Sequence, residues 1–490
     1  MHRTGSTLLA LVCLMAATGC GGGLLDAKGM SGADLSQGGI QDMMLARDII
    51  EQGGIPGSEH FASEGLFSEH DLAIAGDACE ELLCPRAAMA RVQTVGSSEA
   101  RLLAQLGFAT NIDLQSFERD SLDLVVAVDI SGSMQGEKIG ATRAALRALV
   151  GQLDEGDRLG IVTFDDRVSV RSELIAVDAD GRRQLLDRID GIETDGGTWI
   201  EGGLQRAFEM ADAASPAEGV SKRVMLLTDA QPNVGATGTS SFLGMARSYA
   251  DRDIGLTSFG VGMDLGHELA SELARIRGGN SYTLGSVAEI RSAFDDGFDF
   301  MVTPLAYDLE VVVTPSAGLN AEEGYGVAVD PDGDVGFGAA TLFLSNKGGG
   351  MGIALVAPEG DVESVSEAAV SMSLSFEAAG DGERTFDDIE VALSSGETYQ
   401  LVEDSEVVHA ADDGGVFTMA VLIDELAALD MGASFCDGEQ EAAAASGVIR
   451  QAADRLEAAS AQISEESLQA EAQLMRKLAD NVDGGASNCW

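Results

Sequence analysis

The stretch that most constrains this chain is Leu122–Met134, which reads LDLVVAVDISGSM. It opens with an apolar, mostly β-branched run, which is typical of a strand buried on both faces of a parallel sheet. Asp129, Ser131 and Ser133 then place oxygen-bearing side chains at alternate positions as the strand turns into a loop. Such side chains converge if the loop curls over the strand end, and hard cations such as Mg²⁺ and Ca²⁺ prefer oxygen ligands. The stretch therefore predicts a buried strand that ends in a candidate metal site.

Apolar strands and amphipathic helices alternate downstream of this stretch. We expect strands at 158–164, 223–229, 254–261 and 280–284, with an edge strand or hairpin at 168–175. We expect helices at 138–153, 182–189, 200–211, 242–251, 268–276 and 287–298. Strands separated by helices imply right-handed crossovers and a mostly parallel sheet that is covered on both faces. Ligands of such sheets bind outside the carboxyl ends of the strands, where Asp129 falls.

Two other loops are predicted to reach the same edge of the sheet. Thr198 closes a Gly-Gly-Thr turn that precedes the helix expected from residue 200. Asp229 follows Thr228 at the end of a buried strand, so its carboxylate emerges where that of Asp129 does. An Asp-x-Ser-x-Ser, a Gly-Gly-Thr and a strand-ending Thr-Asp on one edge form a specific constellation.

These motifs resemble a von Willebrand factor type A domain with a metal-ion-dependent adhesion site, in the versions carried by bacterial lipoproteins. The resemblance covers residues 121–302 and implies a Rossmann-like α/β domain whose mostly parallel central sheet is flanked by helices. It also implies that three hydroxyls and two carboxylates bind Mg²⁺, or Ca²⁺ or Mn²⁺, directly or through water. The residues that match these ligands are Ser131, Ser133, Thr198, Asp129 and Asp229.

The resemblance also implies a function. Neutral hydroxyl ligands leave much of a divalent charge uncompensated, so an open coordination position favours a carboxylate from a partner protein. The expected function is therefore binding of a protein partner through the metal, and the alternative is a structural or assembly scaffold in which the metal is only structural. Two positions depart from the usual pattern: Ala230 stands where a glycine is common, and Trp199 stands where a polar residue is common. We expect Trp199 to pack beside the site rather than to contact a ligand.

The first residues have the pattern of a targeting signal. Residues 1–19 combine a short positive start, an apolar core and a small-residue cleavage site, and they look like a bacterial lipoprotein signal that makes Cys20 the acylated first residue. An ordinary secretory signal with an incidental cysteine is the alternative. We expect a lipid-anchored protein of the cell envelope, at the outer membrane on its periplasmic or surface face.

Four cysteines remain after Cys13 and Cys20 are set aside: Cys79, Cys84, Cys436 and Cys489. An even number in an oxidising compartment indicates disulfides, and three pairings are possible. The simplest of these joins neighbours in the sequence, Cys79 to Cys84 and Cys436 to Cys489.

The remaining parts of the chain have distinct patterns. Residues 20–76 are predicted to be a flexible linker, although 42–52 could form a helix. Residues 77–120 are expected to form a small lead-in module with helical spacing at 99–106. Residues 303–405 carry β-branched runs between Gly/Asp turns, which indicates an antiparallel β-sandwich. Residues 406–490 return to helical spacing and predict a C-terminal helical region.

The charge balance and the motifs exclude several functions. The chain has 81 acidic and 30 basic residues and a net charge of −51, so nucleic acid and anionic lipid headgroups are poor partners. Ser133 lacks the Gly-x-Ser-x-Gly pattern of a hydrolase nucleophile, and phosphate-cradling and dinucleotide motifs are absent. The acidic stretch at 330–334 resembles a calcium loop, but Val335 and Thr341 stand where Gly and Glu belong, so we expect an acidic turn. Catalysis is not expected.

Overall fold

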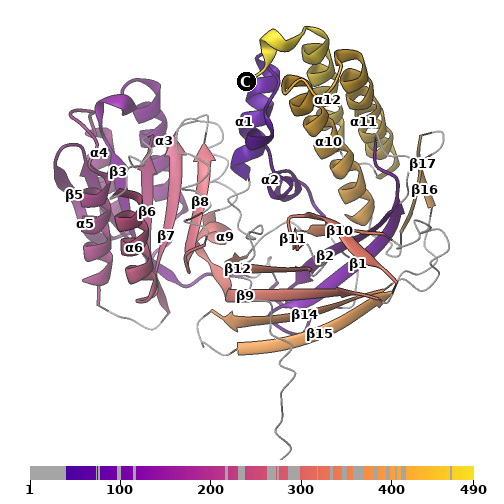
Figure 1. The fold of residues 1–490 in the computed structure, drawn as a ribbon. Coiled ribbons are helices and arrows are strands. Elements are labelled where there is room, and N and C mark those ends of the chain that lie inside the picture. The colour runs from indigo at the N-terminus through magenta and orange to yellow at the C-terminus, as the bar shows by residue number, and fades with distance from the viewer. Residues whose placement is uncertain are drawn as a thin grey trace, which may run out of the picture.

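The structure is a computed structural model, and it describes residues 40–72, 74, 78–95, 101–113, 117–215, 219–229, 238–261, 272, 275–284, 298–316, 318–330, 335–344, 350–356, 369–379, 384–392, 398–402, 405–409, 415–463 and 466–490. Residues 1–19, Cys20 and Ala230 lie outside this part of the chain, as do most of the helices predicted at 268–276 and 287–298 and of the turn predicted at 330–334. Figure 1 shows an α/β unit beside curved β-sheets, with a helical bundle packed on those sheets.

The α/β unit is built on a six-stranded sheet with the order β5-β4-β3-β6-β7-β8. Its strands are β3 (Ser121–Asp129), β4 (Arg158–Phe164), β5 (Val168–Ala176), β6 (Val220–Thr228), β7 (Ile254–Val261) and β8 (Gly279–Leu284). All neighbours pair in parallel except β5, which runs antiparallel to β4 at the edge. The predicted mostly parallel sheet and its edge strand are confirmed.

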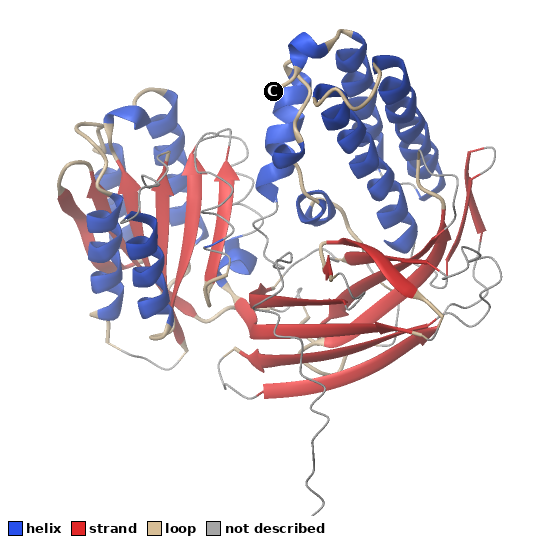
Figure 2. Cartoon of the chain, in the orientation of Figure 1, coloured by secondary structure: helices blue, strands red, loops and turns tan. Residues whose placement is uncertain are grey.

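Helices cover both faces of this sheet (Figure 2). The four main helices are α3 (Glu137–Gln152), α4 (Ala179–Asp190), α5 (Ile200–Asp212) and α6 (Gly238–Ala250). Alternate residues of β3 point to opposite faces, so Val126 and Val128 share a core with α3 and α4, while Val125 and Ala127 share a core with α5 and α6. This two-sided burial explains the continuous apolar run of β3.

Below this unit lies a β-sandwich of two antiparallel sheets (Figure 1). Its first sheet contains β10 (Asn320–Tyr325), β13 (Met351–Val356), β2 (Arg101–Ala109), β1 (Cys84–Val92), β17 (Ser405–His409) and β16 (Thr398–Val402), in that order. The second contains β11 (Ala328–Val329), β12 (Val335–Phe343), β9 (Pro304–Pro315), β14 (Ala369–Ala378) and β15 (Arg384–Ala392). The predicted antiparallel sandwich is confirmed, and two of its strands come from the lead-in segment.

The helical spacing predicted at 99–106 is wrong for residues 101–106, which belong to strand β2 and pair with β1 and β13. Leu102 and Leu106 face the sandwich core, whereas Leu103 faces the core of the helical bundle. A strand that is apolar on both faces has no alternation of period two, and its pattern can be mistaken for that of a helix.

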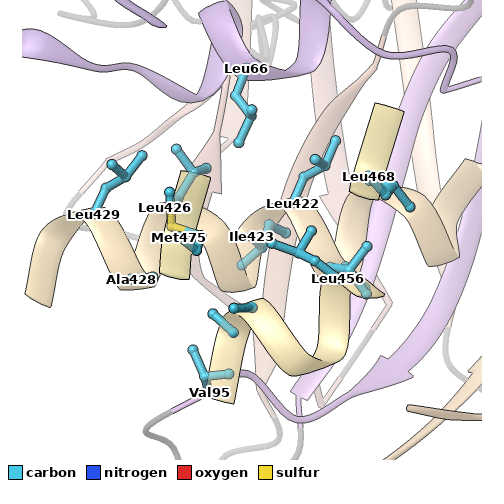
Figure 3. Close-up of a cluster of buried hydrophobic side chains, with 14 of the residues drawn as sticks. Leu66, Val95, Leu422, Ile423, Leu426, Ala428, Leu429, Leu456, Leu468 and Met475 are labelled. Atoms are coloured by element: carbon cyan, nitrogen blue, oxygen red, sulfur yellow. The ribbon is translucent and has the colours of Figure 1, made fainter. Parts of the chain in front are cut away.

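The C-terminal helices pack with N-terminal helices on the outer face of the first sheet. These elements are α10 (Gly415–Cys436), α11 (Ala442–Ile463), α12 (Glu466–Asp483), α1 (Ile40–Glu51) and α2 (Ser63–Ser68). Figure 3 shows Leu66 of α2 and Val95 beside Leu422 and Met475 in one apolar core. The linker prediction therefore does not hold for residues 40–72. Within the described residues, no helix has the length and apolar content needed to cross a membrane.

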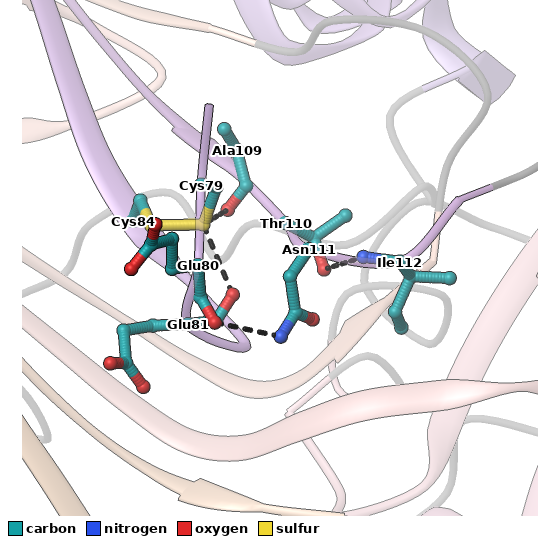
Figure 4. The surroundings of a disulfide bond; sticks show 8 residues. All are labelled: Cys79, Glu80, Glu81, Cys84, Ala109, Thr110, Asn111 and Ile112. Carbon is teal, nitrogen blue, oxygen red and sulfur yellow. Dashed lines mark hydrogen bonds between the residues drawn. A yellow bond between two sulfur atoms is a disulfide. The ribbon is translucent and has the colours of Figure 1, made fainter. Parts of the chain in front are cut away.

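Two disulfides close loops in this part of the molecule. Cys79 pairs with Cys84 and Cys436 pairs with Cys489, with Cα atoms 5.8 and 5.6 Å apart respectively. Figure 4 shows the first disulfide beside Asn111, whose Nδ2 donates to the Glu80 carbonyl at 3.0 Å. The simplest of the three possible pairings is confirmed.

The sandwich joins the α/β unit at the amino ends of its strands. Helix α9 (Phe298–Val302) leads directly into β9. The N–H of Gly278, just before β8, donates to Thr341 Oγ1 at 2.7 Å, and the guanidinium of Arg277 lies 3.8 Å from the ring centroid of Tyr307. The carboxyl ends of the strands therefore lie at the opposite edge, away from the sandwich. Two short helices, η2 (Ser58–His60) and η5 (Ala486–Asn488), lie in the N-terminal and C-terminal segments.

Candidate metal-binding site

Asp129 is the last residue of β3 and is fully buried at the carboxyl edge of the sheet. One carboxylate oxygen accepts the backbone N–H of Ser131 at 2.8 Å, so the side chain itself shapes the turn that follows the strand. The other oxygen accepts the hydroxyl of Thr228, from the neighbouring strand β6, at 2.6 Å. These two bonds fix the carboxylate between the loops after β3 and β6.

The hydroxyls of Ser131 and Ser133 lie next to the second carboxylate. Ser133, in the short helix η3 (Gly132–Met134), donates to Asp229 Oδ1 at 2.8 Å. The two serine hydroxyl oxygens are 3.0 Å apart. Ser131 and Asp229 are buried while Ser133 is exposed. The cluster therefore opens to solvent on one side.

A lysine that the sequence prediction did not include completes the cluster. The Nζ of Lys138 donates to Asp229 Oδ2 at 2.7 Å, and its side chain is 34% exposed. Lys138 lies in the first turn of α3, five residues after Ser133. The only signal in the sequence is a basic residue closely following the motif in a strongly acidic chain.

The Gly-Gly-Thr loop is bonded to the loop that carries the serines. The N–H of Gly132 donates to the Gly196 carbonyl at 3.1 Å, and the N–H of Asp195 donates to the Ile130 carbonyl at 2.8 Å. Thr198 is exposed on this loop and stands outside the hydrogen-bonded cluster of Asp129, Ser131, Ser133 and Asp229. The structure thus brings four of the five predicted ligands into one cluster and places the fifth on an adjoining loop.

Both glycines of this loop lie close to the carboxylate of Asp166. Gly196 has φ +72°, and a Cβ there would meet Asp166 Oδ2 at 2.9 Å. A Cβ at Gly197 would meet Asp166 Oδ1 at 2.5 Å. The loop after β4 thereby supports the loop that carries Thr198.

Trp199 stands at the rim of the site and is 52% exposed. Its ring lies against the first turn of α5, where a Cβ at Gly202 would come within 2.6 Å of the ring. The expectation that Trp199 packs beside the site agrees with this contact. The same residue nevertheless presents a large apolar surface to solvent next to Thr198.

The electrostatics of the cluster follow from burial. Burial raises the pKa of Asp129, and the nearby negative charge of Asp229 acts in the same direction. The hydrogen bonds from Thr228 and Ser131 oppose this rise without cancelling it. A buried carboxylate with this balance is stabilised by any additional positive charge.

The donor set is all oxygen, which fits a hard cation such as Mg²⁺. It comprises two carboxylates and neutral hydroxyls, and the described residues contain no group of three His, Cys, Asp or Glu side chains arranged to hold a metal. A cation at this edge would therefore depend on the serine hydroxyls.

Residues 123–296 match the family described as the von Willebrand factor type A domain. This part of the chain has the fold of a von Willebrand factor type A domain. The match ends before the sandwich, so the family covers neither the β-sandwich nor the helical bundle of this protein.

Relatives of known sequence share this domain. Uncharacterized protein YfbK of Escherichia coli K12 is 26% identical over 205 residues, which is 41% of this chain and 35% of that protein. Inter-alpha-trypsin inhibitor heavy chain H4 of Sus scrofa is 27% identical over 187 residues, 37% of this chain and 20% of that protein. The matched region thus spans about a third or less of these relatives. A solved structure, von Willebrand factor type A from Catenulispora acidiphila, is 16% identical, covers 80% of this chain and 89% of that chain, and has a TM-score of 0.42.

Proposed function

We propose that the chain binds a divalent cation at the carboxyl edge of its von Willebrand factor type A domain and, through that cation, a protein partner that offers a carboxylate. Domains of this family commonly mediate protein–protein interactions. The observation that carries the proposal is the convergence of Asp129, Ser131, Ser133 and Asp229 in a cluster that is buried on one side and exposed at Ser133. Mg²⁺ is the proposed native metal, with Ca²⁺ or Mn²⁺ as substitutes.

Each side chain has a distinct role in this proposal. Ser131 and Ser133 offer hydroxyl oxygens, and Ser133 can keep its hydrogen on Asp229 while its lone pairs face the cation. Asp129 and Asp229 act directly or through water, and Thr198 offers a hydroxyl from the adjoining loop. The bound cation supplies a Lewis-acidic position that attracts an incoming carboxylate. The hydroxyl ligands add no negative charge of their own, so a coordination position of the cation can still attract that carboxylate.

We also propose where the protein resides. The pattern of residues 1–19 and Cys20 supports a lipid-anchored protein of the bacterial cell envelope, at the outer membrane. The proposed role is binding rather than catalysis, and the net charge of −51 supports a protein partner over nucleic acid. The alternative is an assembly scaffold in which the metal is only structural.

The test combines metal binding with partner capture. The chain from Gly21 onward is titrated calorimetrically with MgCl₂ and then immobilised against envelope extract with Mg²⁺ or with chelator. The Ser131→Ala/Ser133→Ala variant removes two hydroxyl ligands, and Ser169→Ala, an exposed serine of edge strand β5, is the matched control.

We expect wild type and Ser169→Ala to bind Mg²⁺ and to retain a partner in a chelator-sensitive manner, and the double variant to do neither. If the double variant binds Mg²⁺ as wild type does, the metal site is contradicted. If a partner is retained regardless of chelator and substitution, the binding surface belongs to the sandwich or to the helical bundle, and the scaffold alternative is favoured.

A further inference from the structure

Lys138 places a fixed positive charge on one of the two carboxylates of the candidate metal site. Its Nζ is 2.7 Å from Asp229 Oδ2, on the side opposite the Ser133 hydroxyl, which bonds Oδ1. The carboxylate of Asp229 is almost fully buried, while the lysine side chain is 34% exposed. The lysine is therefore partly open to solvent, whereas the carboxylate that its ammonium group contacts is not.

The position of this lysine is not explained by the helix that carries it. Gly136 is the N-cap of α3, so Lys138 lies in the first turn, where the helix dipole favours acidic rather than basic side chains. Lysine at this position therefore costs the helix a small amount of stability. The contact with Asp229 offsets this cost, since an unpaired buried carboxylate is more unfavourable.

Charge balance shows what the lysine does for the site. Asp129 and Asp229 contribute two negative charges within one hydrogen-bonded cluster, and Lys138 reduces this to one. A divalent cation entering the cluster would meet the ammonium group at short range, and like charges so close repel each other strongly in a partly buried setting. The lysine therefore opposes the cation that the carboxylates attract.

We propose that Lys138 is a built-in counter-cation of the site: it neutralises Asp229 in the metal-free protein, lowers the affinity for a divalent cation, and leaves the loaded site with one net positive charge. This inference rests on the proposed function, because it concerns the same metal site. Two carboxylates and a divalent cation alone would be neutral. The additional positive charge of Lys138 makes the loaded site more attractive to an anionic group of a partner. The flexible four-carbon stem allows the ammonium group to move aside as the cation enters.

The test uses three substitutions in the chain from Gly21 onward. Lys138→Met removes the charge and keeps the stem, Lys138→Gln also removes the charge but keeps a hydrogen-bond donor, and Lys138→Arg keeps the charge. Lys477→Met is the control, because Lys477 pairs with Glu51 on the exposed surface of the bundle. Affinity for Mg²⁺ and Mn²⁺ is measured by calorimetry, and the thermal midpoint is measured with chelator and with saturating Mg²⁺.

We expect Lys138→Met and Lys138→Gln to bind Mg²⁺ roughly tenfold tighter than wild type. With chelator, Lys138→Met should unfold about 2–4 °C below wild type, and saturating Mg²⁺ should remove this difference. Lys138→Arg and Lys477→Met should match wild type in affinity. If Lys138→Gln binds more tightly while Lys138→Met proves too unstable to titrate, the inference is still supported.

Two results would overturn the inference, and they differ in what else they overturn. If wild type binds Mg²⁺ and neither charge-removing variant binds it more tightly, Lys138 is not a counter-cation, while the proposed metal site stands. If neither wild type nor any variant binds a divalent cation, the proposed function and this inference both fail.

Discussion

The buried carboxylates at the carboxyl edge of the α/β sheet and those of the helical bundle have different partners. At the carboxyl edge of the von Willebrand factor type A domain, Asp129 and Asp229 are bonded to hydroxyls and to a lysine that approaches from solvent. In the helical bundle, Asp424 of α10 accepts from Arg455 of α11 at 3.0 Å and from the N–H of Val95 at 2.8 Å, with both charged side chains buried.

A second buried carboxylate in the bundle is also paired with an arginine, which here is half-buried. Glu471 of α12 accepts two bonds from the guanidinium of Arg47 of α1, at 2.7 and 2.8 Å. An internal arginine satisfies a carboxylate geometrically and closes the network to further ligands. Hydroxyls leave lone pairs available, and a mobile lysine can be displaced. Acidic groups are therefore held by arginines inside the bundle, whereas at the sheet edge they lie in a cluster of hydroxyls that keep lone pairs available.

The largest effect on stability is expected when the buried arginine of the bundle is removed. Arg455→Met would leave Asp424 buried without its cation, and we expect the free energy of unfolding to fall by about 3–5 kcal/mol. Mg²⁺ binding should be unchanged. Urea unfolding at neutral pH measures the loss, and Arg450→Met on the exposed face of the same helix, which pairs with Asp483, should cost less than about 1 kcal/mol. A small loss for Arg455→Met would show that the bundle tolerates a lone buried carboxylate.

A pH profile sharpens the comparison within the bundle. Glu425 of α10 is fully buried; burial, together with the negative charge of Glu471, raises its pKa well above the ordinary value. The folded protein then holds a proton that the unfolded chain releases, so this group lowers stability by about 1.4 kcal/mol per pH unit as the pH rises above about 4.5, until the folded pKa is reached.

Glu425→Gln has no proton to lose at this position. We expect it to match wild type near pH 4.5 and to be more stable than wild type at pH 7–8. Chemical unfolding at several pH values measures the difference. Parallel pH profiles for wild type and Glu425→Gln would contradict the raised pKa. Stability lost equally at every pH would instead indicate a packing defect.

The smallest effect on stability is expected at the rim of the metal site. Trp199→Ala removes a ring that is 52% exposed, so the free energy of unfolding should fall by less than about 1 kcal/mol, whereas retention of a metal-dependent partner should weaken several-fold. Trp490→Ala is a matched control, because Trp490 is 57% exposed and packs on Gly54, away from the site. Surface capture of the partner measures both variants. Equal retention by the two variants would exclude Trp199 from the interface.

Much of the α/β domain could be predicted from its sequence because its signals are local. Each buried strand, such as Arg158–Phe164, is a continuous apolar run, and each helix that follows has its own apolar spacing. The carboxyl ends of parallel strands meet at one edge, so Asp129 and Asp229 could be placed together before any coordinates were known. Lys138 could not be placed at this site from the sequence. A lysine in a helix contacts Asp229 only if the turn before the helix directs it there.

The N-terminal third was harder to predict for a different reason. The helix at Ile40–Glu51 shares a core with α10 and α12, more than 300 positions away, and the strand at Arg101–Ala109 packs one face on that core and the other on the sandwich core. In neither segment does the spacing of apolar residues show which element packs against it. A segment rich in glycine and acidic residues therefore resembled a linker, and a strand buried on both faces resembled a helix.

The sequence by itself determined the order of strands and helices in the α/β domain, the oxygen-bearing side chains at its edge and the set of possible disulfides. Only the tertiary structure decided that β1 and β2 pair with β13 and β17 in one sheet, and that Lys138 lies on Asp229. The physical reason is that the backbone groups at the edge of a strand offer the same hydrogen bonds to any other strand, so they do not select which strand pairs there. Distant partners are therefore selected by the surfaces that become buried together, which no local pattern contains.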